Sequence, residues 1–144
     1  MAKVPLELRV SLREGSVYYF RDRALSSGEP HFQIVVNDPL RQQILLLTVV
    51  TSKIEKVKHR RRECLDTLVE LGPGDLPKIL TRASIVDCNQ LIRIDLDEFC
   101  DRWARNEIAA FGKDVPATLR VALRKAIHAS KIVPDEIKAL IAKP

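Results

Sequence analysis

Residues 44–50 read ILLLTVV, and residues 51–62 continue directly as TSKIEKVKHRRR. A short, continuous apolar run with β-branched residues is typical of a strand that is buried in a core. The run that follows sets one carboxylate, Glu55, against six cations, which are Lys53, Lys56, Lys58, Arg60, Arg61 and Arg62. We therefore expect a rigid strand that delivers two hydroxyl groups and a dense positive charge to one edge of the fold.

The charge of the chain favours an acidic partner. The 144 residues carry a formal net charge of +5 at pH 7, and the densest positive charge lies in the run at 51–62. Polyphosphate chains are common targets of such a run, because each neutralised phosphate releases condensed counterions. Nucleic acid is therefore the first partner that we expect. The alternative is a solvated, charge-rich loop that keeps the protein soluble.

Composition points to one globular unit. The chain is 46% hydrophobic and 30% charged, which is too apolar for intrinsic disorder. A chain of this length buries about two thirds of the surface that its unfolded form exposes. The first ten residues do not form a signal-peptide core, and no apolar run approaches the roughly 20 residues of a membrane span. We expect a cytoplasmic protein with no membrane segment.

Three cysteines form no CxxC pair, so the sequence indicates neither a disulfide framework nor a zinc knuckle. We expect three reduced thiols, with Cys88 and Cys100 in the core. We also expect no metal and no other cofactor.

Short β-type runs fill the chain up to about residue 95. They cover residues 4–12, 16–20 (SVYYF), 31–36 (HFQIVV), 44–50, 67–71, 84–86 and 90–94. The alternation in residues 4–12 predicts a strand, although the run also suits an amphipathic helix. Between the runs we expect a loop at 21–30, a helical turn at 76–80 and a turn at 87–89, where Asp87 and Asn89 flank Cys88. Many short strands with Gly and Pro turns indicate a small barrel or a strongly curved sheet.

The period of the apolar residues changes after residue 97. Apolar side chains at three- and four-residue spacings predict helices over 99–111 and 119–127, and a third helix after Pro134. We therefore predict an α+β, mainly β, fold. Its first part, residues 1–96, is the barrel, and residues 97–144 are a helical extension packed on it.

Four landmarks in this order and spacing carry a family resemblance: GSVYYF at 15–20, PHFQIVV at 30–36, TSK at 51–53 and SIVDCN at 84–89. They resemble the PemK/MazF family of bacterial toxins from type II toxin-antitoxin systems, over roughly residues 14–96. The resemblance implies a compact SH3-like barrel, usually a homodimer, that cleaves single-stranded RNA without a metal. It also implies a cognate antitoxin whose flexible tail covers the RNA groove.

One position departs from the family pattern. In the family an arginine commonly precedes the strand that here begins HFQIVV, and it acts beside a threonine at the end of the following core strand. This chain has His31 at the first position and Thr51 at the second. Either His31 takes over part of that role, or Arg21 or Arg23 reaches in from the preceding loop, or the activity has been lost.

The residue types also suit RNA cleavage by general chemistry. When the 2′-hydroxyl of RNA attacks the adjacent phosphate, the reaction requires proton transfers and cations around the crowded phosphorus. A histidine such as His31 suits a proton transfer, and Thr51 and Ser52 offer hydroxyls to a phosphate oxygen. The plain alternatives are a structural histidine and polar residues that satisfy backbone groups at a strand end.

These observations define the candidate site. The predicted catalytic residues are His31, Thr51 and Ser52, and Tyr18, Tyr19 and Phe32 are candidate stacking faces for unpaired bases. The predicted RNA contacts are Arg21, Arg23, Lys53, Lys56, Lys58, Arg60, Arg61 and Arg62. The alternative function is a non-catalytic RNA- or protein-binding module on the same barrel scaffold.

Overall fold

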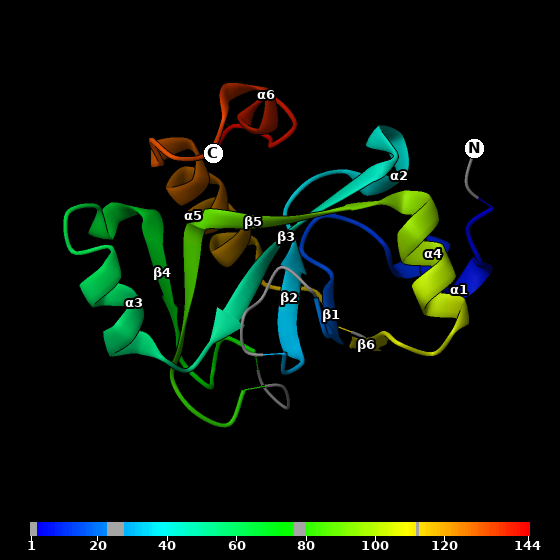
Figure 1. The fold of residues 1–144 in the computed structure, drawn as a ribbon, viewed down its shortest axis with the longest axis horizontal. Helices are drawn as coiled ribbons and strands as arrows, with labels where there is room; N and C mark the ends of the chain where they lie inside the picture. The colour runs from blue at the N-terminus through cyan, green and yellow to red at the C-terminus, as the bar shows by residue number, and fades with distance from the viewer. Residues whose placement is uncertain (1–2, 23–27, 77–79, 112) are drawn as a thin grey trace.

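The structure is a computed structural model that describes residues 3–22, 28–76, 80–111 and 113–144. Its strands are β1 (Val17–Phe20), β2 (His31–Val35), β3 (Ile44–Thr51), β4 (Leu68–Leu71), β5 (Ser84–Asp95) and β6 (Ala109–Phe111). Its helices are α1 (Leu6–Ser11), α2 (Pro39–Gln42), α3 (Ile54–Arg60), the short 3-10 helix η1 (Leu65–Thr67), α4 (Leu96–Ala104), α5 (Ala117–Ala129) and α6 (Asp135–Lys138). Figure 1 shows their arrangement.

The strands form one antiparallel sheet in the order β4-β5-β3-β2-β1-β6. In the described part of the chain, β4 and β6 are the two edges and do not pair with each other, so the sheet is open. The predicted fold class, α+β and mainly β, is confirmed, but the described strands do not close into the small barrel that we predicted.

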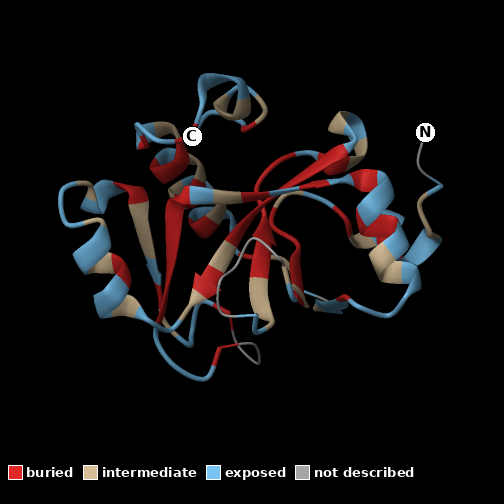
Figure 2. Cartoon of the chain, viewed as in Figure 1, coloured by how far each residue is buried: buried red, intermediate tan, exposed pale blue. Residues whose placement is uncertain are grey.

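Strand β3 lies in the middle of the sheet, where Leu47 is opposite Val35 of β2 and Ile92 of β5. Its alternate side chains enter two different apolar clusters. Leu46 belongs to the cluster under α5, and Leu47 belongs to the cluster under α1 and α4. Because both faces are covered, the strand reads as a continuous apolar run in the sequence. Figure 2 shows the buried residues concentrated along these central strands.

Helices α4 and α5, which the apolar spacing predicted, pack against the two faces of the sheet. Helix α5 buries Leu119, Leu123 and Ile127 against one face of the sheet. Helix α4 buries Phe99 against the other face, where its ring forms a T-shaped pair with that of Tyr18, with 5.1 Å between ring centroids. Cys88 and Cys100 are buried, as predicted. No helix in the described ranges combines the length and the apolarity that crossing a membrane requires.

The predicted helix over 99–111 is wrong in its last part. Helix α4 ends at Ala104, and Asn106 takes a positive φ of 59°, a left-handed conformation that stops a helix. The chain then forms β6, in which Phe111 pairs with Val17 of β1. Residues 97–144 therefore supply an edge strand to the sheet as well as helices. The division of the chain at residue 96 stays a prediction.

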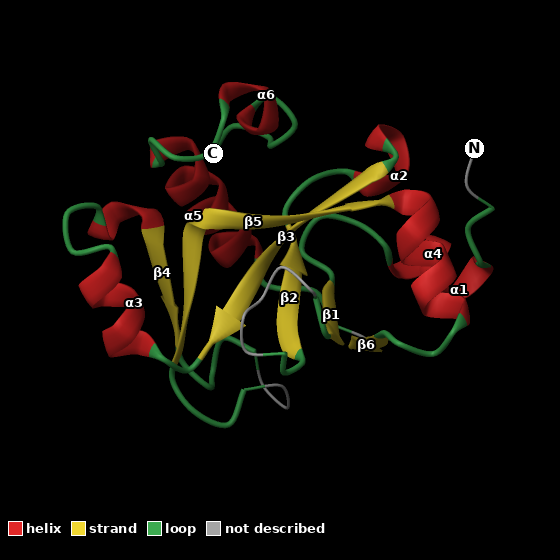
Figure 3. Cartoon of the chain, in the orientation of Figure 1, coloured by secondary structure: helices red, strands yellow, loops and turns green. Residues whose placement is uncertain are grey.

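The turn predicted at 87–89 is also wrong, because β5 runs through it without interruption (Figure 3). The pairing of β5 with β3 shifts there. Val86 pairs with Val50 and Leu91 with Thr48, so four residues of β5 lie opposite one residue of β3. This irregularity is a bulge, which admits turn-forming residues and bends the strand.

Two more segments differ from the sequence predictions. Residues 54–60, which we considered as a charge-rich loop, form α3 and bury Val57. The strand predicted over residues 4–12 is wrong, because residues 6–11 form α1, as the helical alternative proposed. The predicted turn at 76–80 includes residues 77–79, which lie outside the described part of the chain.

Helix α1 generates a stability prediction. Leu8 is fully buried, whereas Leu6, two residues away, is 72% exposed. A strand would place both side chains on one face, and a helix separates them. We expect Leu8→Ala to lower the free energy of unfolding by about 2–5 kcal/mol, since it removes buried methyl groups and leaves a cavity. The matched Leu6→Ala change should cost no more than about 0.5 kcal/mol.

Urea unfolding followed by circular dichroism measures both variants. Equal losses from the two substitutions would contradict the helical placement of this segment.

Candidate functional site

An open pocket of about 250 Å³ lies at the edge of the sheet where β2 begins and β3 ends. His31, Thr51, Ser52 and Lys53 all line it. The antiparallel topology explains this meeting, because the start of β2 lies beside the end of β3. Residues that are about twenty positions apart in the sequence therefore share one site. The structure thus brings the three predicted catalytic residues and one predicted RNA contact together.

His31 is half-buried and opens β2. Its Nδ1 lies 2.9 Å from the backbone carbonyl oxygen of Glu29. A carbonyl oxygen only accepts hydrogen bonds, so the neutral imidazole must carry its proton on Nδ1 and donate it there. This tautomer leaves the lone pair on Nε2, which is the form that a general base requires.

Thr51 and Ser52 bring hydroxyl groups to the pocket from the end of β3. The Thr51 Oγ1 accepts a hydrogen bond from the backbone N–H of Lys53 at 3.3 Å. The Thr51 hydroxyl proton is thereby left to donate elsewhere. Ser52 is exposed, and its carbonyl accepts from the N–H of Ile54 at 2.9 Å, where α3 begins. Both residues thus lie in the short connection where β3 ends and α3 begins.

Arg82 also lines the pocket, and the sequence analysis missed it. It reaches the site from the segment before β5, and its side chain is exposed. Because β5 pairs antiparallel to β3, with Ile85 opposite Thr51, the residues just before Ser84 lie beside the residues just after Thr51. The signal that could have found Arg82 is therefore this strand pairing, which cannot be read from local spacing.

The two arginines proposed from the loop at 21–30 are not placed in this site. Arg21 is exposed and does not line the pocket, and its carbonyl oxygen accepts a hydrogen bond from the guanidinium of Arg102. Arg23 lies outside the described residues.

Half of the cations in the basic run are paired with carboxylates. Arg60 and Arg61 both contact the carboxylate of Asp87, at 3.1 Å and 2.9 Å, and Lys58 contacts Glu70 at 3.0 Å. Of the remaining three, Lys53, Lys56 and Arg62, none forms an ion pair with another described residue, and all are exposed. Charge density in the sequence therefore overstates the number of cations that are available to a ligand.

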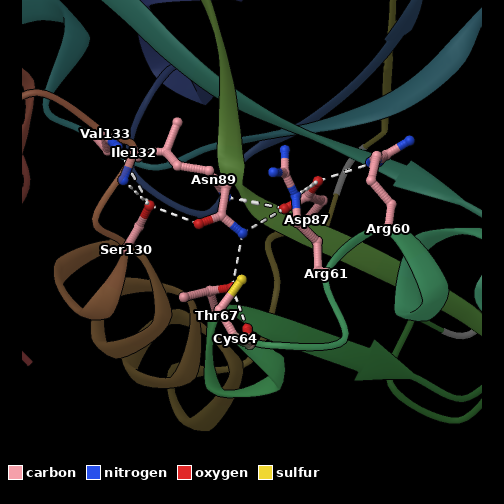
Figure 4. Close-up of polar contacts among 9 residues, drawn as sticks. All are labelled: Arg60, Arg61, Cys64, Thr67, Asp87, Asn89, Ser130, Ile132 and Val133. Atoms are coloured by element: carbon pink, nitrogen blue, oxygen red, sulfur yellow. Dashed lines mark hydrogen bonds and ion pairs between the residues drawn. The ribbon is translucent and has the colours of Figure 1, made fainter.

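Asp87 belongs to a buried polar network, drawn in Figure 4. The side-chain amide of Asn89 donates to Asp87 Oδ1 at 2.8 Å and to Thr67 Oγ1 at 2.7 Å, and Ser130 Oγ donates to Asn89 Oδ1 at 2.6 Å. Thr67 in turn donates to the carbonyl of Cys64. The network joins β5 to α3, to η1 and to the end of α5.

The carboxyl of Asp87 is held in its ionised form. Burial alone would raise its pKa, but hydrogen bonds from Asn89, Arg61 and Arg60 together bring the pKa below its ordinary value. With its side chain only 7% exposed, Asp87 binds the basic helix α3 to the sheet. Asp87 and Asn89, which we predicted to form a turn, thus hold together the elements around the site.

Aromatic side chains line one side of the pocket. Tyr19 and Phe32 are half-buried, and their ring centroids lie 4.7 Å apart. Tyr18 points into the core, so it is excluded as a stacking face. No cluster of three or more His, Cys, Asp or Glu side chains suited to a metal ion occurs among residues 3–22, 28–76, 80–111 and 113–144.

The fold has a counterpart among solved structures. A chain of the MazE-MazF complex (form III) from Deinococcus radiodurans matches with a TM-score of 0.54 and 11% sequence identity. The match covers 83% of this chain and 94% of that chain. No protein-family model matches the sequence, and no curated protein matches it. The likeness shows that this chain has the MazF/PemK-like fold that the four sequence landmarks predicted.

The network around Asp87 generates a prediction about stability and pH. Asp87→Asn removes the charge that compensates Arg60 and Arg61, so we expect a loss of about 3 kcal/mol in the free energy of unfolding at pH 7. The folded-state pKa of Asp87 is lowered, so its stabilising effect is present above the ordinary pKa of about 4 and is lost as the pH falls through the folded-state value.

Urea unfolding from pH 7 down to pH 2 measures this difference. The gap between the unaltered chain and Asp87→Asn should narrow on acidification, while Asp66→Asn, at an exposed carboxylate, should cost no more than about 0.5 kcal/mol. A gap that stays constant over this range would contradict the prediction.

Proposed function

We propose that this chain is a metal-independent endoribonuclease toxin of a bacterial type II toxin-antitoxin system, which cleaves single-stranded RNA. The observation that carries the proposal is that His31, Thr51, Ser52 and Lys53 all line the same pocket. A base, two hydroxyl donors and a cation are the groups that cleavage by the 2′-hydroxyl requires. The MazF/PemK-like fold supports the same proposal by analogy.

His31 acts as the general base in this scheme. Its Nε2 accepts the proton of a ribose 2′-hydroxyl, since the Glu29 carbonyl keeps the other ring proton on Nδ1. The 2′-oxygen then bonds to the phosphorus, and the bond from phosphorus to the 5′-oxygen breaks. The leaving oxygen gains a proton, which water can supply in this open pocket. The products are a 2′,3′-cyclic phosphate and a 5′-hydroxyl.

The hydroxyls of Thr51 and Ser52 stabilise the charge that builds on the phosphate oxygens. Thr51 is the last residue of the core strand β3 and Ser52 follows it directly, so little backbone rearrangement is needed when the charge develops. Lys53 adds a positive charge at the same edge. Tyr19 and Phe32 offer aromatic surface to an unpaired base beside the phosphate.

The proposed partners follow from the same site. A cytoplasmic toxin of this kind needs an antitoxin, and one solved structure with a similar fold is itself a complex, named MazE-MazF. We propose that a cognate antitoxin covers the pocket, and that the protein works as a homodimer. Lys56 and Arg62 are exposed and follow the pocket's Lys53 in the sequence, within and just after α3, and we propose that they add cations for an RNA strand that leaves the pocket.

Cleavage of unstructured RNA in the presence of EDTA tests the function. We expect the unaltered protein to yield 2′,3′-cyclic phosphate ends. His31→Ala should lower the cleavage rate by about 10²–10⁴ through loss of the general base. Thr51→Ala should lower it by about 10² through loss of a donor to the developing charge.

Thr118→Ala, an exposed threonine on α5, is the control and should cleave at the unaltered rate. Circular dichroism and urea unfolding show whether each variant is folded. Salt-sensitive RNA binding without any cleavage would instead establish the non-catalytic binding module. Cleavage that survives both pocket substitutions would place the chemistry elsewhere in the molecule.

A further inference from the structure

We propose that Arg82 is the phosphate-binding residue of the pocket, and that it holds the scissile phosphodiester from the side opposite His31 and β2. This inference rests on the proposed function and specifies which cation of the chain meets the substrate. Its starting observation is that Arg82 lines the same pocket as His31, Thr51 and Lys53 although it is distant from all three in the sequence.

The backbone that carries Arg82 is anchored. The next strand begins at Ser84, which is buried, and the Ser84 Oγ donates to the carbonyl oxygen of Arg82 at 3.3 Å. Ile85 is fully buried and pairs with Thr51. The Cα of Arg82 is thereby held at a fixed place across from the end of β3, while its long side chain stays exposed and can turn toward a ligand.

Arg82 differs from the other arginines near the site because no carboxylate of the described residues neutralises its charge. Arg60 and Arg61 contact Asp87, and Asp87 is buried and ionised. To bind a phosphate, these two would have to leave a compensated buried carboxylate, which is costly. Arg82 forms no ion pair with any described residue. Its guanidinium can therefore meet an incoming phosphate without first leaving a carboxylate of the described part of the chain.

The chemistry of the side chain favours phosphate over a carboxylate or a neutral ligand. A guanidinium presents a planar fork of N–H donors that fits two phosphate oxygens at once, whereas Lys53 supplies a point charge. The pocket already offers the hydroxyls of Thr51 and Ser52 to the same group. Glu29 also lines the pocket, but Lys53 and Arg82 together outweigh its one negative charge, so the ionised side chains of the lining leave a net positive charge.

The arrangement explains how the site can work with a histidine in the first position of β2. His31 and Arg82 approach the pocket from separate elements, one at the start of β2 and one before β5. Proton transfer and phosphate binding are thus divided between two residues. The proton-transfer residue can then be a neutral imidazole, because the positive charge arrives from another strand.

Binding of a 2′-O-methyl oligoribonucleotide, which lacks the attacking hydroxyl, tests the inference without cleavage. We expect Arg82→Ala to weaken binding by about 10-fold or more, as for loss of hydrogen bonds to a charged group. The slope of log K against log salt should also become shallower by roughly 0.7, the value for one phosphate contact on a single strand. Arg82→Lys should restore part of the salt dependence and less of the affinity.

Lys125→Ala removes one exposed cation from α5, away from the pocket lining, and is the matched control. Equal weakening by Arg82→Ala and Lys125→Ala would overturn the inference, as would no binding of the oligonucleotide by the unaltered protein. Arg82-dependent binding together with no cleavage of ordinary RNA would contradict the nuclease and leave Arg82 as a phosphate-binding residue. Cleavage that is unaffected by Arg82→Ala would support the nuclease and overturn the role of Arg82.

Discussion

Strand β3 lies between two apolar clusters, so each of its side chains from Ile44 to Val50 must be apolar or hydrogen-bonded inside the sheet. The chain can first carry polar groups toward water at Thr51, which is half-buried at the end of the strand, and at Ser52, which is exposed after it. The position of the pocket follows from this packing, since antiparallel pairing brings the start of β2 and the approach to β5 to the same edge. The burial of one strand therefore selects which residues meet at the site.

Two polar clusters flank this strand, and they differ in how far their hydrogen bonds are satisfied. The network around Asp87 is buried and closed: the carboxylate receives two arginines and Asn89, and Asn89 is held by Thr67 and Ser130. The pocket is open, with Nε2 of His31 and the Arg82 guanidinium facing no partner in the described residues. Closed networks stabilise a fold, and open ones are available to a ligand.

The fold and the proposed chemistry of this chain depend on different residues. At 11% identity the chain keeps the architecture of a MazF/PemK-like protein, while the first position of β2 carries histidine. A fold tolerates such a change because the side chain lies at an edge and contributes little to the core. The reaction that we propose depends on this side chain directly. The function proposed for this protein therefore rests on the pocket's own residues and on their tests, and the fold supplies the framework that holds them.

Local patterns in the sequence determined the features that an apolar run or an apolar period marks directly. These are the buried strand β3, the amphipathic helix α5, the strands β1 and β2, and the buried Cys88 and Cys100. Tertiary structure decided the rest. Residues 87–89 form a bulge because β5 must pair with two strands at once, and the segment ending at Phe111 is a strand because β1 has a free edge to cover. Arg82 reaches the pocket because β5 pairs with β3, whereas Arg60 is held away from it by its ion pair with Asp87. Pairing between distant strands and a buried carboxylate set these positions, and neither leaves a periodic signal in the sequence around them.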